Sequence, residues 1–267
     1  MDALRQVADW PARTAAAGVV SATAELGTVG PRDETLAWAS VTKLLTALAV
    51  LVAVEEGAVD LDEPAGPPGS TLRHLLSHAS GLALDETAPL APPGRRRIYS
   101  NAGIQAAADL VESAAEMPFR DYLGRAVLEP LRLVGRLRTS PAWGYAGPLD
   151  DLLALGRELL APTLVAPETL AEATTVQFPG LVGVLPSYGR MEPNDWGLGF
   201  ELRDAKSPHW TGSRNSPATF GHFGAAGTFL WVDPDAGVAC GVVTNLEFGD
   251  WAKDAWPRLS DAVLSQI

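Results

Sequence analysis

Cysteine and long apolar runs are scarce in this chain of 267 residues. The single cysteine, Cys240, cannot form an intramolecular disulfide, and its apolar neighbours in GVACGVV predict a buried thiol. The longest apolar run, LLTALAVLVAV, is too short to cross a bilayer, which takes about 20 residues. The N-terminal segment also lacks the unbroken apolar stretch of a secretory signal. We therefore expect a cytoplasmic protein that has no membrane partner.

Basic residues are few, since 20 lysines and arginines stand against 32 aspartates and glutamates, for a formal net charge of -12. Such a chain repels phosphate backbones, so we expect no nucleic-acid partner. The one basic cluster, Arg95 to Arg97, lies in a Pro/Gly-rich segment. It indicates a local structural role or a contact with substrate.

Motifs for metal binding and for α/β-hydrolase chemistry are also missing. His74 and His78 are four residues apart in HLLSH, but no glutamate stands between them and no third ligand is evident. Helix packing is therefore favoured over a metal site. The sequence G-x-S-x-G of the α/β-hydrolases does not occur. We expect neither a metal nor a cofactor.

Strand-forming segments lie near both ends of the chain. AAGVVSATAEL occurs near the start, and WGLGFEL, GTFLWVD and GVACGVVTN follow residue 195, the last two joined by the turn PDAG. Helical patterns cover residues 72–78, 102–128 and 149–160, and a last helix follows residue 249. Strands at both ends with helices between them indicate an α+β fold.

The predicted architecture is one antiparallel sheet assembled from both termini, flanked by helices, with an inserted helical lobe. We expect residues 1–60 and 190–267 to form the sheet domain and residues 61–189 to form the mainly helical lobe. A cleft between these two parts is the expected place for a functional site. The sequence gives no prediction of the oligomeric state.

The stretch WASVTKLLTALAVLVAVEEG, residues 38–57, predicts a buried helix whose first turn carries Ser40 and Lys43. Residues three apart share one helix face, so the lysine amine can reach the serine hydroxyl. A serine needs a base to take its proton, and burial lowers the pKa of a lysine until its amine is such a base. A helix start also favours negative charge on an attacked carbonyl. The alternative is a serine that only caps the helix.

Two further segments contain residues suited to the same chemistry. In RIYSN, Tyr99 can act as a general base and acid if a nearby lysine favours its phenolate form, and Asn101 offers an amide to the lysine or to substrate. In FGHFGAAGTFLWVD, glycines allow close approach of a backbone, and an edge strand can present His222 and a backbone N–H to the cleft. The alternatives are packing by Tyr99, helix capping by Asn101 and an ordinary loop histidine.

Together these three motifs resemble the serine β-lactamase and penicillin-binding protein superfamily, in its class C β-lactamase, D-Ala-D-Ala carboxypeptidase and family VIII esterase branch. The order S-V-T-K, Y-S-N and H-F-G matches, and the surrounding stretches VDLDEPAG, RHLLSHASGL, VLEPL and GTFLWVDPDAG are similar to those of the family. The resemblance covers nearly the whole chain and implies a β-lactamase/transpeptidase-like fold.

The resemblance implies a role for each matched residue. Ser40 would be the acylated nucleophile, Lys43 its activating partner and Tyr99 the shared acid and base. Asn101 would orient the lysine or the substrate. Substrate would also contact the third motif, His222, Phe223, Gly224 and Ala225, where the N–H groups of Ser40 and Ala225 would form the oxyanion hole.

Two departures from the family pattern bear on the substrate. Phe223 replaces a hydroxyl residue that often contacts a substrate carboxylate, and His222 replaces a lysine. We expect His222 to be partly charged near neutral pH and to make activity titrate in the histidine range. Both changes weaken the binding of an anionic β-lactam or peptide C-terminus.

The predicted function is hydrolysis of small-molecule esters or simple amides through an acyl-enzyme on Ser40. A β-lactamase or D-Ala-D-Ala carboxypeptidase of the same fold is the first alternative, and a non-catalytic binding or regulatory protein is the second. Four aromatic residues near the third motif either line an apolar acyl pocket or belong to the core: Trp196, Trp210, Phe220 and Phe223.

Overall fold

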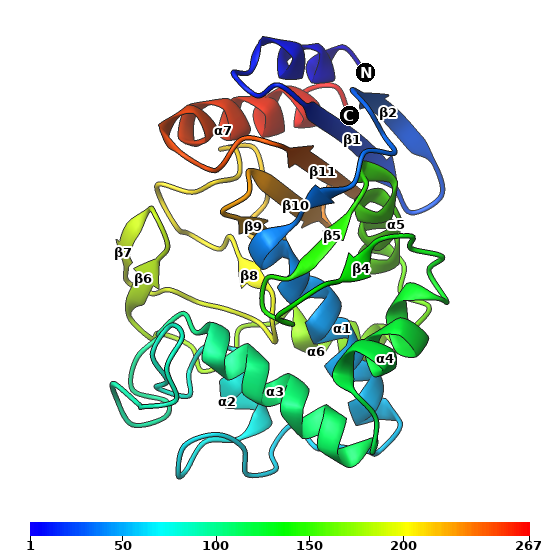
Figure 1. Ribbon diagram of the computed structural model, residues 1–267. Coiled ribbons are helices and arrows are strands. Elements are labelled where there is room, and N and C mark those ends of the chain that lie inside the picture. Colours follow the sequence, from blue (N-terminus) through cyan, green and yellow to red (C-terminus); the bar gives the residue numbers. More distant parts are fainter.

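A six-stranded antiparallel sheet forms the centre of the computed structural model, which describes residues 1–267 (Figure 1). Its strand order is β2-β1-β11-β10-β9-β8. The strands are β1 (Ala15–Ser21), β2 (Glu25–Val29), β8 (Glu201–Leu202), β9 (Phe220–Gly224), β10 (Thr228–Asp233) and β11 (Val238–Thr244). Because β1 and β11 pair along their whole length, the two ends of the chain share one sheet. This confirms the predicted α+β fold with a sheet built from both termini.

Both faces of the sheet are buried at its central strands, which explains why β10 and β11 are mainly apolar along their length. Along β10, Phe229 and Trp231 belong to one apolar core, whereas Leu230 and Val232 belong to the other. Successive side chains of a strand point to opposite faces, so a strand between two cores needs apolar residues throughout. Cys240 of β11 is fully buried in the first of these cores, as predicted.

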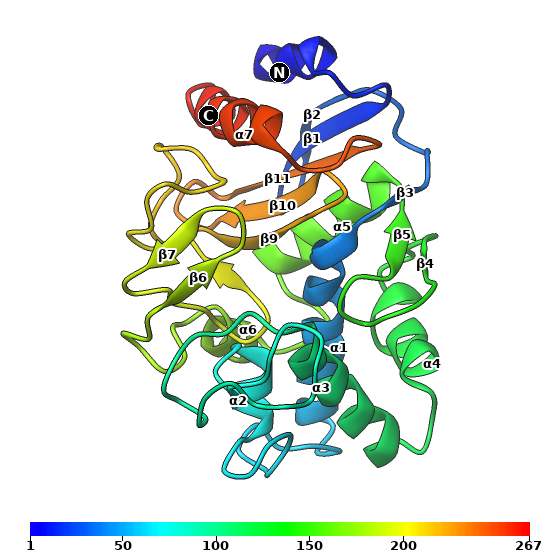
Figure 2. The same ribbon diagram turned by 60° about the vertical axis from the view of Figure 1, so that its left-hand side comes forward.

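Helices cover the two faces of this sheet (Figure 2). The 3₁₀ helix η1 (Asp2–Asp9) and the C-terminal helix α7 (Asp250–Leu264) pack on one face and share its core. Helix α5 (Leu149–Leu160) packs on the other face, where a Cβ added to Gly18 or Gly241 would meet its leucines. The predicted domain boundaries at residues 60 and 190 stay a prediction. Helix α5 lies in the segment 61–189 that was expected to form the helical lobe, yet it packs on the sheet.

Helix α1 (Thr42–Glu55) runs from the sheet into the helical part of the molecule (Figures 1 and 2). Residues 42–51 are all buried, as expected for a helix that is apolar all round and surrounded by other elements. It ends before Gly57, whose φ of +71° favours glycine. No helix combines the length and the apolar character that crossing a membrane requires.

Shorter elements complete the fold around α1. The helices are η2 (Ala39–Val41), α2 (Leu72–Leu76), α3 (Asn101–Ala114), α4 (Phe119–Leu123), the π-helical turn η3 (Gly124–Leu128) and α6 (Pro167–Ala173). Two small sheets contain β3 (Leu36–Ala37), β4 (Arg136–Leu137) and β5 (Tyr145–Gly147), and β6 (Gly183–Leu185) and β7 (Gly189–Met191).

Three predicted elements differ from the structure. The stretch AAGVVSATAEL is a hairpin of β1 and β2, because Ser21 turns the chain with hydrogen bonds to Ala24. The helix expected over 102–128 is broken after α3, since Glu116 has a φ of +50° and Pro118 precedes α4. In WGLGFEL only the last two residues form a strand.

Removing volume from the buried face of α1 should destabilise the fold. Leu48 is fully buried, so Leu48→Ala leaves a cavity, and we expect the free energy of unfolding to fall by about 2–5 kcal/mol. Urea denaturation measures it. Val134→Ala is the matched control, because Val134 is 73% exposed. Equal stabilities of the two variants would contradict the central place of α1.

Candidate active site

Ser40 lies in the 3₁₀ turn η2, directly before α1. The residue before it, Ala39, has a φ of +45°, a backbone conformation that residues other than glycine rarely adopt. The turn places Ser40 at the positive end of α1 and leaves its side chain half-buried. A serine held in a strained turn at a helix start is suited to nucleophilic attack.

Lys43, one helical turn after Ser40, is completely buried and points back at it. Its Nζ lies 3.2 Å from Ser40 Oγ, 2.7 Å from Asn101 Oδ1 and 2.9 Å from the carbonyl oxygen of Ala142. Asn101 is the first residue of α3, and Ser100 is the residue that caps this helix. The side chain of Asn101 therefore bridges Lys43 and Asp85, since its Nδ2 donates to Asp85 Oδ1 at 2.9 Å.

Tyr99, in the loop before α3, also contacts Ser40. Its hydroxyl donates to Ser40 Oγ at 2.8 Å and lies 3.4 Å from Nε2 of His222. His78 fixes the backbone around it, because the His78 carbonyl accepts from Ile98 N at 2.9 Å and its Nδ1 accepts from Ser100 N at 3.2 Å. The ring of His78 also lies against Tyr99, with 4.6 Å between ring centroids. His78 thus holds Tyr99 in place.

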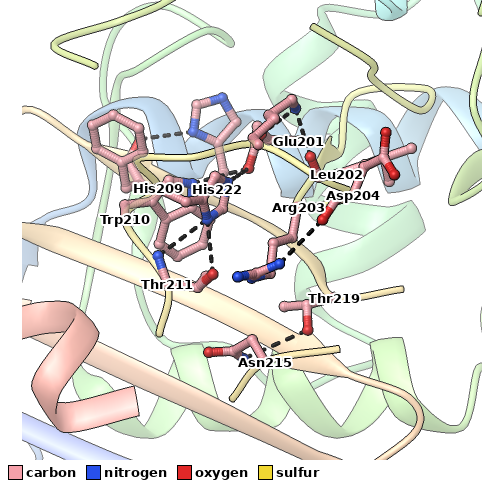
Figure 3. A network of polar contacts seen from close by, with 12 residues as sticks. Glu201, Leu202, Arg203, Asp204, His209, Trp210, Thr211, Asn215, Thr219 and His222 are labelled. Carbon is pink, nitrogen blue, oxygen red and sulfur yellow. Dashed lines mark hydrogen bonds and ion pairs between the residues drawn. The ribbon is translucent and has the colours of Figure 1, made fainter. Parts of the chain in front are cut away.

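His222 of β9 presents an unprotonated nitrogen to the site. Its Nδ1 lies 2.7 Å from the carbonyl oxygen of Phe223, which can only accept, so Nδ1 carries the proton. Nε2 of the neutral ring is then an acceptor that faces Tyr99. A buried network lies behind it, in which Glu201 accepts from Lys206, from His209 Nε2 at 2.9 Å and from Trp210 Nε1 at 2.9 Å (Figure 3).

The end of β9 lies against the backbone of Ser40. A Cβ added to Gly224 would be 2.3 Å from the carbonyl oxygen of Trp38 and 3.1 Å from Ser40 N. Only glycine permits this approach. The next residue, Ala225, donates no backbone hydrogen bond, while its carbonyl accepts from Phe248 N at 2.8 Å. The N–H of Ala225 is therefore available beside Ser40.

A cavity of about 350 Å³ opens over Ser40. Most of its wall is apolar or aromatic, and none of its twelve lining residues is lysine or arginine. The lining consists of Ser40, Leu84, Tyr99, Asn101, Leu185, Pro186, Ser187, Trp196, His222, Phe223, Ala225 and Phe248. Of the four aromatic residues considered from the sequence, Trp196 and Phe223 line this cavity. All four belong to the apolar cores, and Trp210 and Phe220 lie in them without lining the cavity.

Burial sets the protonation of the three central groups. It lowers the pKa of Lys43 to about 7, against an opposing effect of the Asp85 carboxylate. It lowers the pKa of His222 to about 3, helped by the nearby Lys43 charge. It raises the pKa of Tyr99 well above its usual range. The expectation of a partly charged His222 was therefore wrong, as was that of a favoured Tyr99 phenolate in the resting site.

These pKa values define where the protons lie. A neutral Lys43 donates its two N–H groups to its two shorter contacts, the oxygens of Asn101 and Ala142. Its lone pair then faces Ser40, whose hydroxyl proton is free because Tyr99 donates to Ser40 Oγ. The resting site can therefore pass the proton of Ser40 to Lys43.

The structure separates His74 from His78. Helix α2 ends at Leu76, and His78 follows it with a φ of +56°, so the two rings do not share a helix face. His74 instead stacks on Phe178, with centroids 4.1 Å apart, and its Nδ1 accepts from the N–H of Thr71 at 3.3 Å.

The arginine cluster contains three different environments. Arg97 is buried and structural, since it donates to the carbonyl oxygens of Ser77 and Gln177, both at 2.6 Å. Arg96 is exposed and lines a second hollow beside the cavity. Arg95 is exposed and lines neither.

Sequence reasoning missed several residues of the site. Asp85 and the Ala142 carbonyl, both in loops, contact Asn101 and Lys43, and His78 supports Tyr99. No local sequence pattern marks Asp85 or Ala142, because each contacts a residue that is 16 or more positions away in the sequence. His78 carried a weak signal, as a histidine in a stretch similar to the family.

Comparison with known proteins identifies the family of this chain. The model of the family described as Beta-lactamase matches residues 12–264. A crystal structure of a β-lactamase from Mycobacterium bovis is 53% identical, with a TM-score of 0.98, and the match covers 99% of this chain and 98% of that one. The chain belongs to the Beta-lactamase family.

Two more distant structures share the fold of this Beta-lactamase family protein. Simvastatin synthase (LovD) from Aspergillus terreus is 19% identical with a TM-score of 0.82, over 99% of this chain and 96% of that one. EstCE1, a hydrolase with promiscuous acyltransferase activity, is 18% identical with a TM-score of 0.81, over 98% and 97%. A search of curated proteins found no match.

The reactivity of Ser40 should depend on the neutral form of Lys43. Because the pKa of Lys43 lies at about 7, we expect its reaction with a fluorophosphonate to slow about tenfold per pH unit below that value. Asp85→Asn should move this limb to lower pH, since the carboxylate raises the pKa of Lys43. The limb should persist in His222→Gln, and its loss there would show that His222 is the titrating group.

Adding a methyl group to Gly224 should separate β9 from Ser40. The new Cβ would overlap the Trp38 carbonyl, so we expect Gly224→Ala to slow fluorophosphonate labelling by about 10²-fold. Gly124→Ala is the matched control, because nothing lies within 4 Å of its Cβ. Circular dichroism checks that both variants fold, and equal labelling rates would contradict the proposed contact.

Proposed function

We propose that this protein hydrolyses small-molecule esters, and simple amides more slowly, through an acyl-enzyme on Ser40. The observation that carries this proposal is the pair of contacts on Ser40 Oγ, 3.2 Å to Lys43 Nζ and 2.8 Å to the Tyr99 hydroxyl, at the floor of a largely apolar cavity. These contacts also favour a catalytic protein over a binding protein that has lost turnover.

Acylation begins with attack of Ser40 Oγ on the ester carbonyl while its proton passes to Lys43. The N–H groups of Ser40 and Ala225 stabilise the oxyanion. When the carbon–oxygen bond to the alcohol breaks, Tyr99 donates its proton to the departing oxygen. The Tyr99 phenolate formed in this step is stabilised by the Lys43 ammonium, whose Nζ lies 4.8 Å from the centre of the Tyr99 ring.

Deacylation reverses these proton movements with water in place of the alcohol. The Tyr99 phenolate takes a proton from water, and the resulting hydroxide attacks the acyl carbonyl. The bond to Ser40 Oγ breaks, and Lys43 returns its proton to the serine. The acid leaves, and each of the three groups has regained its resting protonation.

The absence of a cation in the cavity lining favours esters over anionic substrates. His222 is neutral because of its burial, and Phe223 offers no hydroxyl to a carboxylate. A carboxylate next to the scissile bond would lose water without gaining a charged partner, which costs free energy. Esters without such a group avoid this cost.

Hydrolysis of β-lactams is the second candidate. It is favoured by the Mycobacterium bovis protein, which is described as a β-lactamase and is 53% identical to this chain. The same nucleophile and proton relay would serve it, since opening a lactam ring also proceeds through an acyl-enzyme. The two candidates differ in the substrate that the cavity accepts.

Turnover of p-nitrophenyl butyrate and of nitrocefin by the same preparation tests both candidates. We expect hydrolysis of the ester and little of nitrocefin, with a loss of at least roughly 10³-fold in kcat/KM for Ser40→Ala. Ser213→Ala, at an exposed serine, is the control. Intact-protein mass spectrometry should show butyryl on Ser40. Undiminished turnover by Ser40→Ala would reject the proposed function, and faster turnover of nitrocefin would establish the second candidate.

A further inference from the structure

A second hollow of about 330 Å³ adjoins the cavity over Ser40 and shares Leu84, Tyr99 and Pro186 with it. We call it the outer groove. Its walls come from the loop before α3 and from the β6–β7 hairpin, which lie side by side (Figures 1 and 2). The two walls are joined where Arg97 N donates to the carbonyl oxygen of Val182 at 3.0 Å.

Exposed apolar residues gather at the outer groove. Seven large apolar side chains of the chain are exposed, and three of them, Leu84, Leu90 and Val184, line this hollow, with exposed fractions of 49%, 67% and 55%. Isolated exposed apolar residues are ordinary, but a cluster beside a reactive serine indicates a binding surface. Arg96, in the loop before α3, also lines the outer groove. It forms no ion pair, although the chain has a formal net charge of -12.

The position of Tyr99 decides which part of a substrate enters the outer groove. Tyr99 lines both hollows, and in the mechanism above it protonates the departing alcohol oxygen, which must lie within hydrogen-bond distance of its hydroxyl. From that position the alcohol can continue past Tyr99 into the outer groove, which leaves the inner cavity, lined by Phe223 and Phe248, to the acyl group.

We propose that the outer groove binds the alcohol moiety of the ester, and that this moiety has an apolar body against Leu84, Leu90 and Val184 and an anionic far end at Arg96. The proposal rests on the proposed function and adds the substrate class to it. It agrees with the cation-free inner cavity, because the anion is paired at a distance from the scissile bond.

Three butyrate esters that differ only in the alcohol test this proposal. The alcohol of ethyl butyrate has no large apolar body. That of biphenyl-4-yl butyrate has the apolar body alone, and that of 4′-carboxybiphenyl-4-yl butyrate has both the apolar body and an anionic far end. We expect Val184→Asn to lower kcat/KM by about 3- to 10-fold for both biphenylyl esters and to leave ethyl butyrate unchanged. Arg96→Gln should lower only the value for the carboxylated ester, by about 2- to 5-fold. Val134→Asn and Arg95→Gln are the matched controls.

Binding of the product alcohol separates failure of this proposal from failure of the proposed function. Calorimetry of Ser40→Ala with 4′-hydroxybiphenyl-4-carboxylate should give a Kd that Val184→Asn and Arg96→Gln both raise, even if no ester is hydrolysed. A Kd unaffected by both changes overturns the outer groove as the alcohol site. The proposal would also be overturned if the effect of Val184→Asn on kcat/KM changed with acyl length among ethyl esters, since the acyl group would then lie in the outer groove.

Discussion

A buried amine beside Ser40 is the constraint on which the rest of this structure depends. Lys43 has no exposed surface, and a charge in that place is costly unless it is paired. The fold meets this cost by lowering the pKa of Lys43 to about 7 and by placing Asn101 and the Ala142 carbonyl around its Nζ. A surface lysine would stay charged and could not accept the proton of Ser40.

Three distant segments must meet for that amine to act. Ser40 and Lys43 come from η2 and the first turn of α1. Tyr99 and Asn101 come from the end of a loop and the first residue of α3, and His222 comes from β9. The sheet holds the third segment, and its register brings Gly224 against the backbone of Ser40. Loops hold the second segment, with His78 bonded to the backbone on both sides of Tyr99. The site is therefore as rigid as the contacts between the sheet and the helical part.

Charge is distributed unevenly between the site and its surroundings. Inside the protein, burial alone would raise the pKa of Glu201, but the Lys206 charge and the hydrogen bonds from His209 and Lys206 lower it to about 2. Over Ser40, no charged side chain lines the cavity, and the two nearest titratable rings, His222 and Tyr99, stay neutral. Outside it, Arg96 is the exposed cation of the outer groove, whereas Arg97 is buried and donates to backbone carbonyls. The proposed preference for esters whose charge lies far from the scissile bond rests on this difference.

The sequence alone determined the fold class and the contact between Ser40 and Lys43. The composition of short segments predicted strands near both ends of the chain, and the spacing of Ser40 and Lys43 predicted their contact, since a strand tendency and a helix face both depend on neighbours within a few residues. The tertiary structure decided the rest. It broke the helix expected over 102–128, made His222 neutral and brought Asp85, Ala142 and His78 to the site. Burial and long-range contacts set these features, because pKa and cavity shape depend on what surrounds a group in space.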